Sequence, residues 1–147
     1  MNDVEKIESV ISSFYRALSG RADAPRDWGK FLALFVPGAA VVPSSVANAP
    51  DGPVKAICVS EYAERLRIVL TRSDFYETAA VKRAEVFGNI AQAVCVYEAR
   101  QSPVDAEPFR QGVHYVQLVR MGEDWRITGM IWLDASDTRP LPQEYQR

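Results

Sequence analysis

Apolar side chains near the N-terminus recur every three or four residues, which is the spacing of one buried stripe on an α-helix. The stripe runs through Val4, Ile7, Ile11, Phe14 and Leu18. An N-cap residue, Asn2 or Asp3, precedes the stripe, and Gly20 follows it. Similar spacing predicts a short aromatic helix over 25–35 and another helix over 60–71. We therefore expect three N-terminal helices.

Beyond residue 74 the pattern changes to long runs rich in β-branched and aromatic residues, which predict strands. The four runs cover 75–87, 90–101, 109–121 and 125–134, and short strands are expected at 39–42 and 54–59. Gly88-Asn89 and Gly122-Glu123 lie between runs as two-residue hairpin turns, where glycine supplies a positive φ. The proline- and serine-containing segment 43–53 is expected to be a mobile lid.

These elements predict an α+β fold. We expect a cone-shaped, curved antiparallel sheet of four long strands, with the three helices on its concave face and a pocket enclosed between them. The chain has 147 residues, 48% of them hydrophobic, which suits a single domain. Its core should cover 3–134, followed by an extended tail over 135–147.

Counting outward from the glycine turns assigns strand residues to the two faces of the sheet. The count pairs Glu77 with Arg100 and His114 with Ile131, and a middle connection centred near residue 105 pairs Val96 with His114. The face toward the helices then carries a polar cluster made of His114, Glu98, Arg100, Glu77 and Arg110, beside the small residue Gly112. The other face carries an aromatic patch, Tyr97, Tyr115, Met130 and Trp132, which predicts a homodimer interface.

Three residues are candidate catalytic residues, and two of them belong to the polar cluster. His114 is the one histidine of the chain, and its ordinary pKa near neutrality suits a general acid–base. Glu98 can act as a base or orient His114, and Tyr15 on the first helix is the third candidate. The structural alternatives are a buried histidine with one satisfied partner, an ordinary ion pair of Glu98, and a tyrosine that belongs to the core.

Four further residues are candidates for substrate binding. Arg100 and Arg110 leave a local positive excess beside Glu77, which can hold a carboxylate or an enolate. Gly112 leaves space for that ligand. The alternative is a cross-strand ladder of exposed charges, which needs no ligand.

The composition excludes several function classes. A net charge of −2 provides no broad cationic surface, so nucleic-acid binding is not expected. Cys58 and Cys95 lie far apart without neighbouring histidines, which argues against a zinc site, and no cofactor motif is present. No apolar run is long enough to span a membrane, and the N-terminal residues are polar, so a cytoplasmic protein is expected.

The order of elements and several stretches resemble the nuclear transport factor 2-like superfamily. The stretches are Phe75-Tyr76-Glu77, Phe87-Gly88-Asn89-Ile90-Ala91, Tyr97-Glu98-Ala99-Arg100 and 112–120, together with the closing stretch 124–132. That superfamily includes ketosteroid isomerases, scytalone dehydratases and SnoaL-like polyketide cyclases, and this chain resembles an uncharacterised branch. Because one fold hosts many functions, the resemblance identifies a fold better than a reaction.

The resemblance also suggests roles for individual residues. Ketosteroid isomerases have an aspartate base after the second helix, and 36–42 contains no carboxylate, whereas Tyr15 can stand for their tyrosine. Scytalone dehydratase-like and SnoaL-like members pair a histidine with an aspartate, which here would be His114 with Asp134 or Glu98. The resemblance implies a protein that binds a small apolar or carboxylate-bearing molecule, as an isomerase, dehydratase or cyclase that uses His114. The alternative is a non-catalytic homodimeric association or ligand-carrier module.

Overall fold

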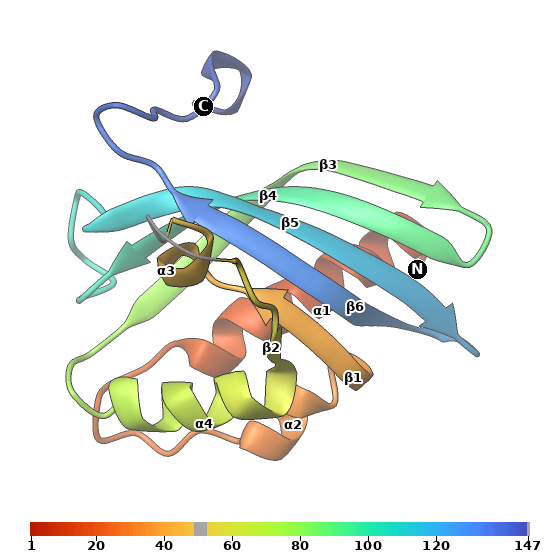
Figure 1. Cartoon of the computed structure of the whole chain (residues 1–147), viewed down its shortest axis with the longest axis horizontal. Coiled ribbons are helices and arrows are strands. Elements are labelled where there is room, and N and C mark those ends of the chain that lie inside the picture. Colours follow the sequence, from red (N-terminus) through yellow and green to blue (C-terminus); the bar gives the residue numbers. More distant parts are fainter. Residues whose placement is uncertain (49–52, 147) are drawn as a thin grey trace.

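The computed structural model describes residues 1–48 and 53–146 and packs helices against one curved sheet (Figure 1). The helices are α1 (Asp3–Leu18), α2 (Trp28–Leu32), α3 (Ser44–Ala47) and α4 (Val59–Val69), with a 3₁₀ helix η1 (Gln143–Tyr145) near the C-terminus. The strands are β1 (Phe35–Val42), β2 (Ile57–Cys58), β3 (Tyr76–Phe87), β4 (Ile90–Arg100), β5 (Arg110–Met121) and β6 (Asp124–Asp134). The expected α+β class is confirmed.

Several predicted elements differ from the observed ones: the strand expected at 39–42 already begins at Phe35, and the strand expected at 54–59 covers only Ile57–Cys58. The second helix, expected over 25–35, ends at Leu32, because Phe35 begins β1 and pairs with Ile127 of β6. The segment 43–53, expected to be a lid without regular structure, contains α3, which packs beside β6. Residues 49–52 of that segment lie outside the described residues. No helix in the described ranges is long and apolar enough to cross a membrane.

The six strands form one sheet in the order β2-β1-β6-β5-β4-β3. β1 runs parallel to β6, whereas all the other neighbouring strands are antiparallel. β3 forms one edge of the sheet. Its pairing with β4 shifts by one residue at Lys82. β6, the last strand in the sequence, lies inside the sheet between β1 and β5 (Figure 1).

The register agrees with the prediction next to the two glycine turns and differs farther along the strands. Gly88 and Gly122 take φ values of 59° and 67°, as their turns require. Phe87 then pairs with Ile90 as expected. His114, however, pairs with Cys95 and Trp132, so its predicted pairing with Val96 and Ile131 is wrong.

Two structural features cause this difference. Thr128 is an extra residue in β6 that shifts its pairing with β5, and the connection between β4 and β5 places Ala99 opposite Arg110. A shift of one residue moves every side chain of a strand to the other face. Glu98 and Arg100 therefore lie on the opposite face from His114.

The same shift corrects the predicted homodimer surface. Tyr97 and Met130 are buried in the core, and Trp132 packs against it, all on the face that carries His114. Tyr115 alone of the four predicted contact residues lies on the outer face, where it is 52% exposed. The predicted aromatic patch is thus mostly part of the interior.

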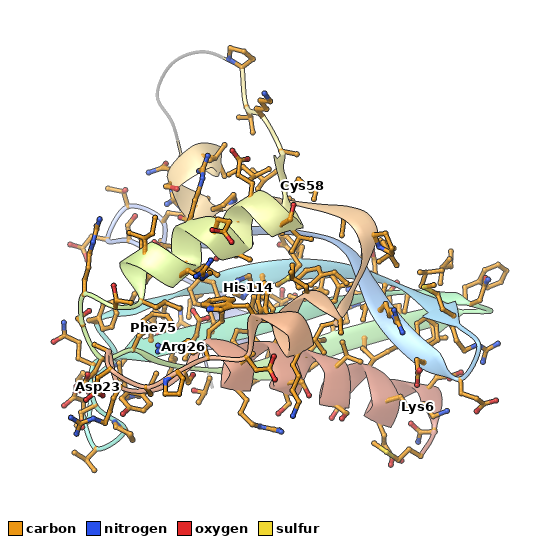
Figure 2. All side chains as sticks on the ribbon, turned by 90° about the horizontal axis from the view of Figure 1, so that it is seen from below. Lys6, Asp23, Arg26, Cys58, Phe75 and His114 are labelled. Carbon is orange, nitrogen blue, oxygen red and sulfur yellow. The ribbon has the colours of Figure 1, made fainter. Side chains whose placement is uncertain are left out.

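The core lies between the helices and the inner face of the sheet. The stripe on α1 is buried as predicted at Ile7, Ile11, Phe14 and Leu18, whereas Val4 is exposed. The inner positions of β4 are mostly small residues, Ala91, Ala93, Cys95 and Ala99, with one large residue, Tyr97. Small side chains on the sheet leave room for aromatic rings from the helices. Figure 2 shows His114 in this layer, between the helices and the sheet.

Candidate functional site

His114 lies at the centre of the buried layer and is only 2% exposed. Four aromatic rings surround the imidazole, with centroid distances of 4.4 Å to Tyr97, 4.8 Å to Trp132, 5.5 Å to Tyr15 and 5.9 Å to Phe14. Burial lowers the pKa of His114 from 6.5 to about 3, because a charged imidazolium is poorly solvated there. The imidazole is therefore neutral near pH 7.

Tyr15 is the hydrogen-bond partner of His114. The α1 stripe turns this side chain toward the sheet, and its hydroxyl shares a hydrogen bond of 2.5 Å with Nδ1 of His114. Burial, together with the nearby Cys95 and Glu77, raises the pKa of Tyr15 well above its ordinary value, so the phenol stays protonated. The pair is a neutral, hydrogen-bonded unit.

Glu77 is the second buried titratable group of the inner face and is 9% exposed. The Ser19 hydroxyl at the end of α1 fixes its backbone, because it accepts from the Glu77 N–H at 2.9 Å and contacts the Glu77 carbonyl at 3.2 Å. Its carboxylate makes no hydrogen bond to any described residue, and its oxygens are not fully enclosed by protein. Burial raises the pKa of Glu77 from 4.5 to about 8, while Arg110 lowers it and Asp134 raises it further. Glu77 therefore exchanges a proton near physiological pH.

Arg110, Asp134 and Tyr97 form a connected group beside Glu77. Nε of Arg110 lies 3.7 Å from Oδ2 of Asp134, and the Tyr97 hydroxyl donates a hydrogen bond to the other carboxylate oxygen. Tyr97 reaches Asp134 by crossing Gly112, which is the register partner of both residues. A Cβ atom at Gly112 would lie 2.3 Å from the Tyr97 hydroxyl and from the Leu133 carbonyl oxygen. Glycine at this position makes the contact possible.

A cavity of about 770 Å³ lies between α1 and β3, and we call it the α1–β3 cavity. Tyr15 and Glu77 line it, together with Ile11, Ala79 and the rim residue Arg100. A volume of this size falls within the range of small-molecule sites in proteins. The cavity gives an organic ligand access to the side chains of Tyr15 and Glu77.

The predicted site residues fall into two groups in the structure. Tyr15, His114, Glu77, Arg110 and Gly112 all lie on the inner side of the sheet, and the first two contact each other.

Glu98 and Arg100 are the two that do not join this group. They form an ion pair of 2.8 Å with each other, as the structural alternative for Glu98 proposed. Arg100 also donates to the Asp105 carbonyl at 2.9 Å and lines only the rim of the α1–β3 cavity.

Sequence reasoning missed the role of Tyr97 and misplaced that of Asp134. Tyr97 was assigned to the outer face, and Asp134 was considered as a partner of His114, whereas the two contact each other. The available signal was Gly112, because a glycine inside a strand often marks the close approach of a neighbouring group. Within the described ranges no three His, Cys, Asp or Glu side chains are placed to bind a metal ion together.

Comparisons with known proteins identify the fold and no reaction. No family model matches the chain, and no curated protein matches its sequence. A protein of unknown function from Mycobacterium tuberculosis superposes with a TM-score of 0.71, at 12% identity over 97% of this chain and 82% of that one.

Two further solved structures agree with that result. A nuclear transport factor 2-like protein of unknown function from Shewanella baltica gives a TM-score of 0.66, at 14% identity over 93% of this chain and 99% of that one. A protein of unknown function with a cystatin-like fold from Nostoc punctiforme gives 0.67, at 13% identity over 95% and 96%. The chain therefore has the nuclear transport factor 2-like fold.

Proposed function

We propose that this protein binds a small organic molecule in the α1–β3 cavity and exchanges a proton with it through Glu77. The observation that carries the proposal is a carboxyl group, 9% exposed and without a hydrogen-bond partner among the described residues, on the wall of a cavity. Its pKa of about 8 supports the role, because a general acid–base works best when its pKa lies near the ambient pH.

The proton-transfer role moves from His114, which the sequence favoured, to Glu77. With a pKa of about 3, the imidazole neither gains nor loses a proton near pH 7. His114 instead acts as a positioning residue, because its Nδ1 holds the Tyr15 hydroxyl that lines the same cavity. In the tautomer whose Nδ1–H donates to the Tyr15 oxygen, the phenol keeps its own O–H as a hydrogen-bond donor for a developing oxyanion.

The reaction class that fits these groups is proton abstraction next to a carbonyl, as in an isomerase, dehydratase or cyclase. The ionised Glu77 takes a proton from a C–H bond of the ligand, whose electron pair moves toward the carbonyl oxygen. The same carboxyl group then returns the proton to another atom of the ligand, so no oxidant, metal or cofactor is needed. The alternative is a homodimeric association module. Three of the four residues predicted for its interface lie in the interior of the protein, which weakens this alternative.

The test uses two probes of nearly equal size, the anion 2-naphthoate and the neutral 2-naphthamide, whose binding is followed by NMR and fluorescence between pH 6 and 10. The affinity of the anionic probe should fall about tenfold as Glu77 ionises, since two negative charges then share the cavity. In Glu77→Gln this fall should disappear, whereas Glu8→Gln, on the exposed rim of the same cavity, should retain it.

Two results would contradict the proposal. One is naphthoate binding with the same pH dependence in Glu77→Gln as in the wild type. The other is the lack of any chemical-shift change at Ile11 and Ala79, which line the cavity, when either probe is added.

A further inference from the structure

A second pocket lies on the outer face of the sheet, beneath the residues that follow β6. We call residues 135–146 the C-terminal arm, which leaves β6 on the side of the sheet away from α1, α2 and α4 (Figure 1). The pocket has a volume of about 380 Å³. Its side-chain lining is mainly apolar and includes Val113, Tyr115, Ile131, Leu133 and Leu141.

The arm has a defined shape that roofs this pocket. Ala135 continues the β5–β6 ladder by donating to the Gln111 carbonyl at 2.7 Å. Ser136 and Arg139 then close a tight turn with two backbone hydrogen bonds of 2.9 and 3.1 Å. Farther on, the Gln146 side chain donates to the Leu141 carbonyl at 2.8 Å. These bonds hold Leu141 and its flanking prolines across from the outer face of β5 and β6.

Two charged residues, Asp134 and Arg139, line this mainly apolar pocket, and Arg139 is its one cation. Its Nε and Nη2 donate to the Asp134 carbonyl oxygen at 3.2 and 2.8 Å, and it forms no ion pair with any carboxylate of the described residues. The Asp134 carboxylate is bound by Tyr97 and Arg110 on the inner side, and Asp137, two residues before Arg139, forms no ion pair with it within the described ranges. A guanidinium has five N–H donors, so Arg139 retains donors and an uncompensated charge for an anion.

We propose that this pocket binds a small amphipathic carboxylate, such as a medium-chain or aromatic acid. The carboxylate pairs with Arg139, whereas the apolar part of the ligand lies against Ile131 and Leu141. Tyr115 and Ile131, which are register partners, are 52% and 49% exposed, and a ligand would cover them. The sheet separates this pocket from the α1–β3 cavity, so the two are distinct sites.

The experiment compares decanoate with 1-decanol, which has the same chain and no charge, at concentrations below micelle formation. Calorimetry and NMR should detect decanoate binding, with shift changes at Val113, Ile131 and Leu141. The variant Arg139→Met keeps an apolar stem of similar length and should weaken decanoate about tenfold, because one charge-assisted pair is lost. Binding of 1-decanol should stay the same in both proteins.

Controls separate this site from the proposed function and from self-association. Glu77→Gln should leave decanoate binding unchanged, whatever its effect in the α1–β3 cavity. Equal decanoate affinity in Arg139→Met, shift changes at Ala79 instead of Leu141, or no binding at all would each overturn the inference. A dimer in solution that buries Tyr115 and excludes decanoate would overturn it too.

Discussion

Glu77 and His114 should give the protein an unusual dependence of stability on pH. Burial raises the pKa of Glu77 from 4.5 to about 8 and lowers the pKa of His114 from 6.5 to about 3. A carboxyl group with a raised pKa binds its proton more tightly in the folded state, so its contribution to stability falls as the pH rises from 4.5 to about 8. An imidazole with a lowered pKa contributes fully above pH 6.5, and this contribution falls as the pH decreases toward 3.

The free energy of unfolding should therefore be nearly constant between pH 4.5 and 6.5, where the two opposite slopes cancel. Each group changes the free energy by about 1.4 kcal/mol per pH unit over its own interval. The wild type should thus lose about 2 kcal/mol between pH 6.5 and 8, and a similar amount between pH 4.5 and 3.

Replacing Glu77 with glutamine should change the shape of this profile. Glutamine has nearly the same size and does not ionise, so the loss above pH 6.5 should disappear. Below pH 6.5 the His114 contribution is then uncompensated, and the free energy of unfolding should rise by about 5 kcal/mol from pH 3 to 6.5. The matched control is Glu144→Gln, an exposed carboxylate of the C-terminal arm.

Urea unfolding followed by tryptophan fluorescence, repeated between pH 3 and 9, measures the three profiles, provided that the urea slope stays the same. Glu144→Gln should follow the wild type. If Glu77→Gln ran parallel to the wild type above pH 6.5, the carboxyl group would not be holding its proton, and the reasoning would be refuted.

Three further substitutions test individual contacts. Asp134→Asn should lower the pKa of Glu77, measured by ¹³C NMR of its carboxyl carbon, because a negative charge that raises this pKa is removed. An unchanged pKa would show that the charge of Asp134 does not act on Glu77. Tyr15→Phe should cost about 1–3 kcal/mol in urea unfolding, since Nδ1 of His114 loses its partner inside the core, and a neutral effect would argue against the 2.5 Å hydrogen bond. Gly112→Ala should lower the melting temperature and cost about 1–3 kcal/mol, because the added methyl group meets a backbone carbonyl that cannot move aside; full stability would show that the strands can separate there.

The sequence was informative where local rules decide the structure. Periodicity identified α1 and the four long strands, because a buried stripe and alternating β-prone residues leave a direct trace in the order of side chains. The turns at Gly88 and Gly122 set the adjacent register correctly, since their positive φ restricts the loop to two residues.

The candidate site was harder to predict than the fold. The face on which a strand residue lies depends on the strand register, and one extra residue changes that register. The bulges at Lys82 and Thr128 carry no signal in the pattern of apolar residues. Gln92, Glu98 and Arg100 of β4 share one face with Val94 and Val96, and the prediction assigned this mixed face to the inner side, with Tyr97 on the outer side. The pKa of Glu77 arises from its burial beside α1, which no local pattern contains.

The parallel pairing of β1 with β6 has a consequence for how the chain is made. A ribosome releases β1 well before β6, yet β6 supplies a neighbour that β1 needs. Until that last strand emerges, the N-terminal segment has an unpaired edge and only part of the surface against which its helices pack. Contacts between such distant parts of a sequence slow folding and leave nascent chains exposed to aggregation. Nascent chains that end before residue 124 should accordingly depend on chaperones.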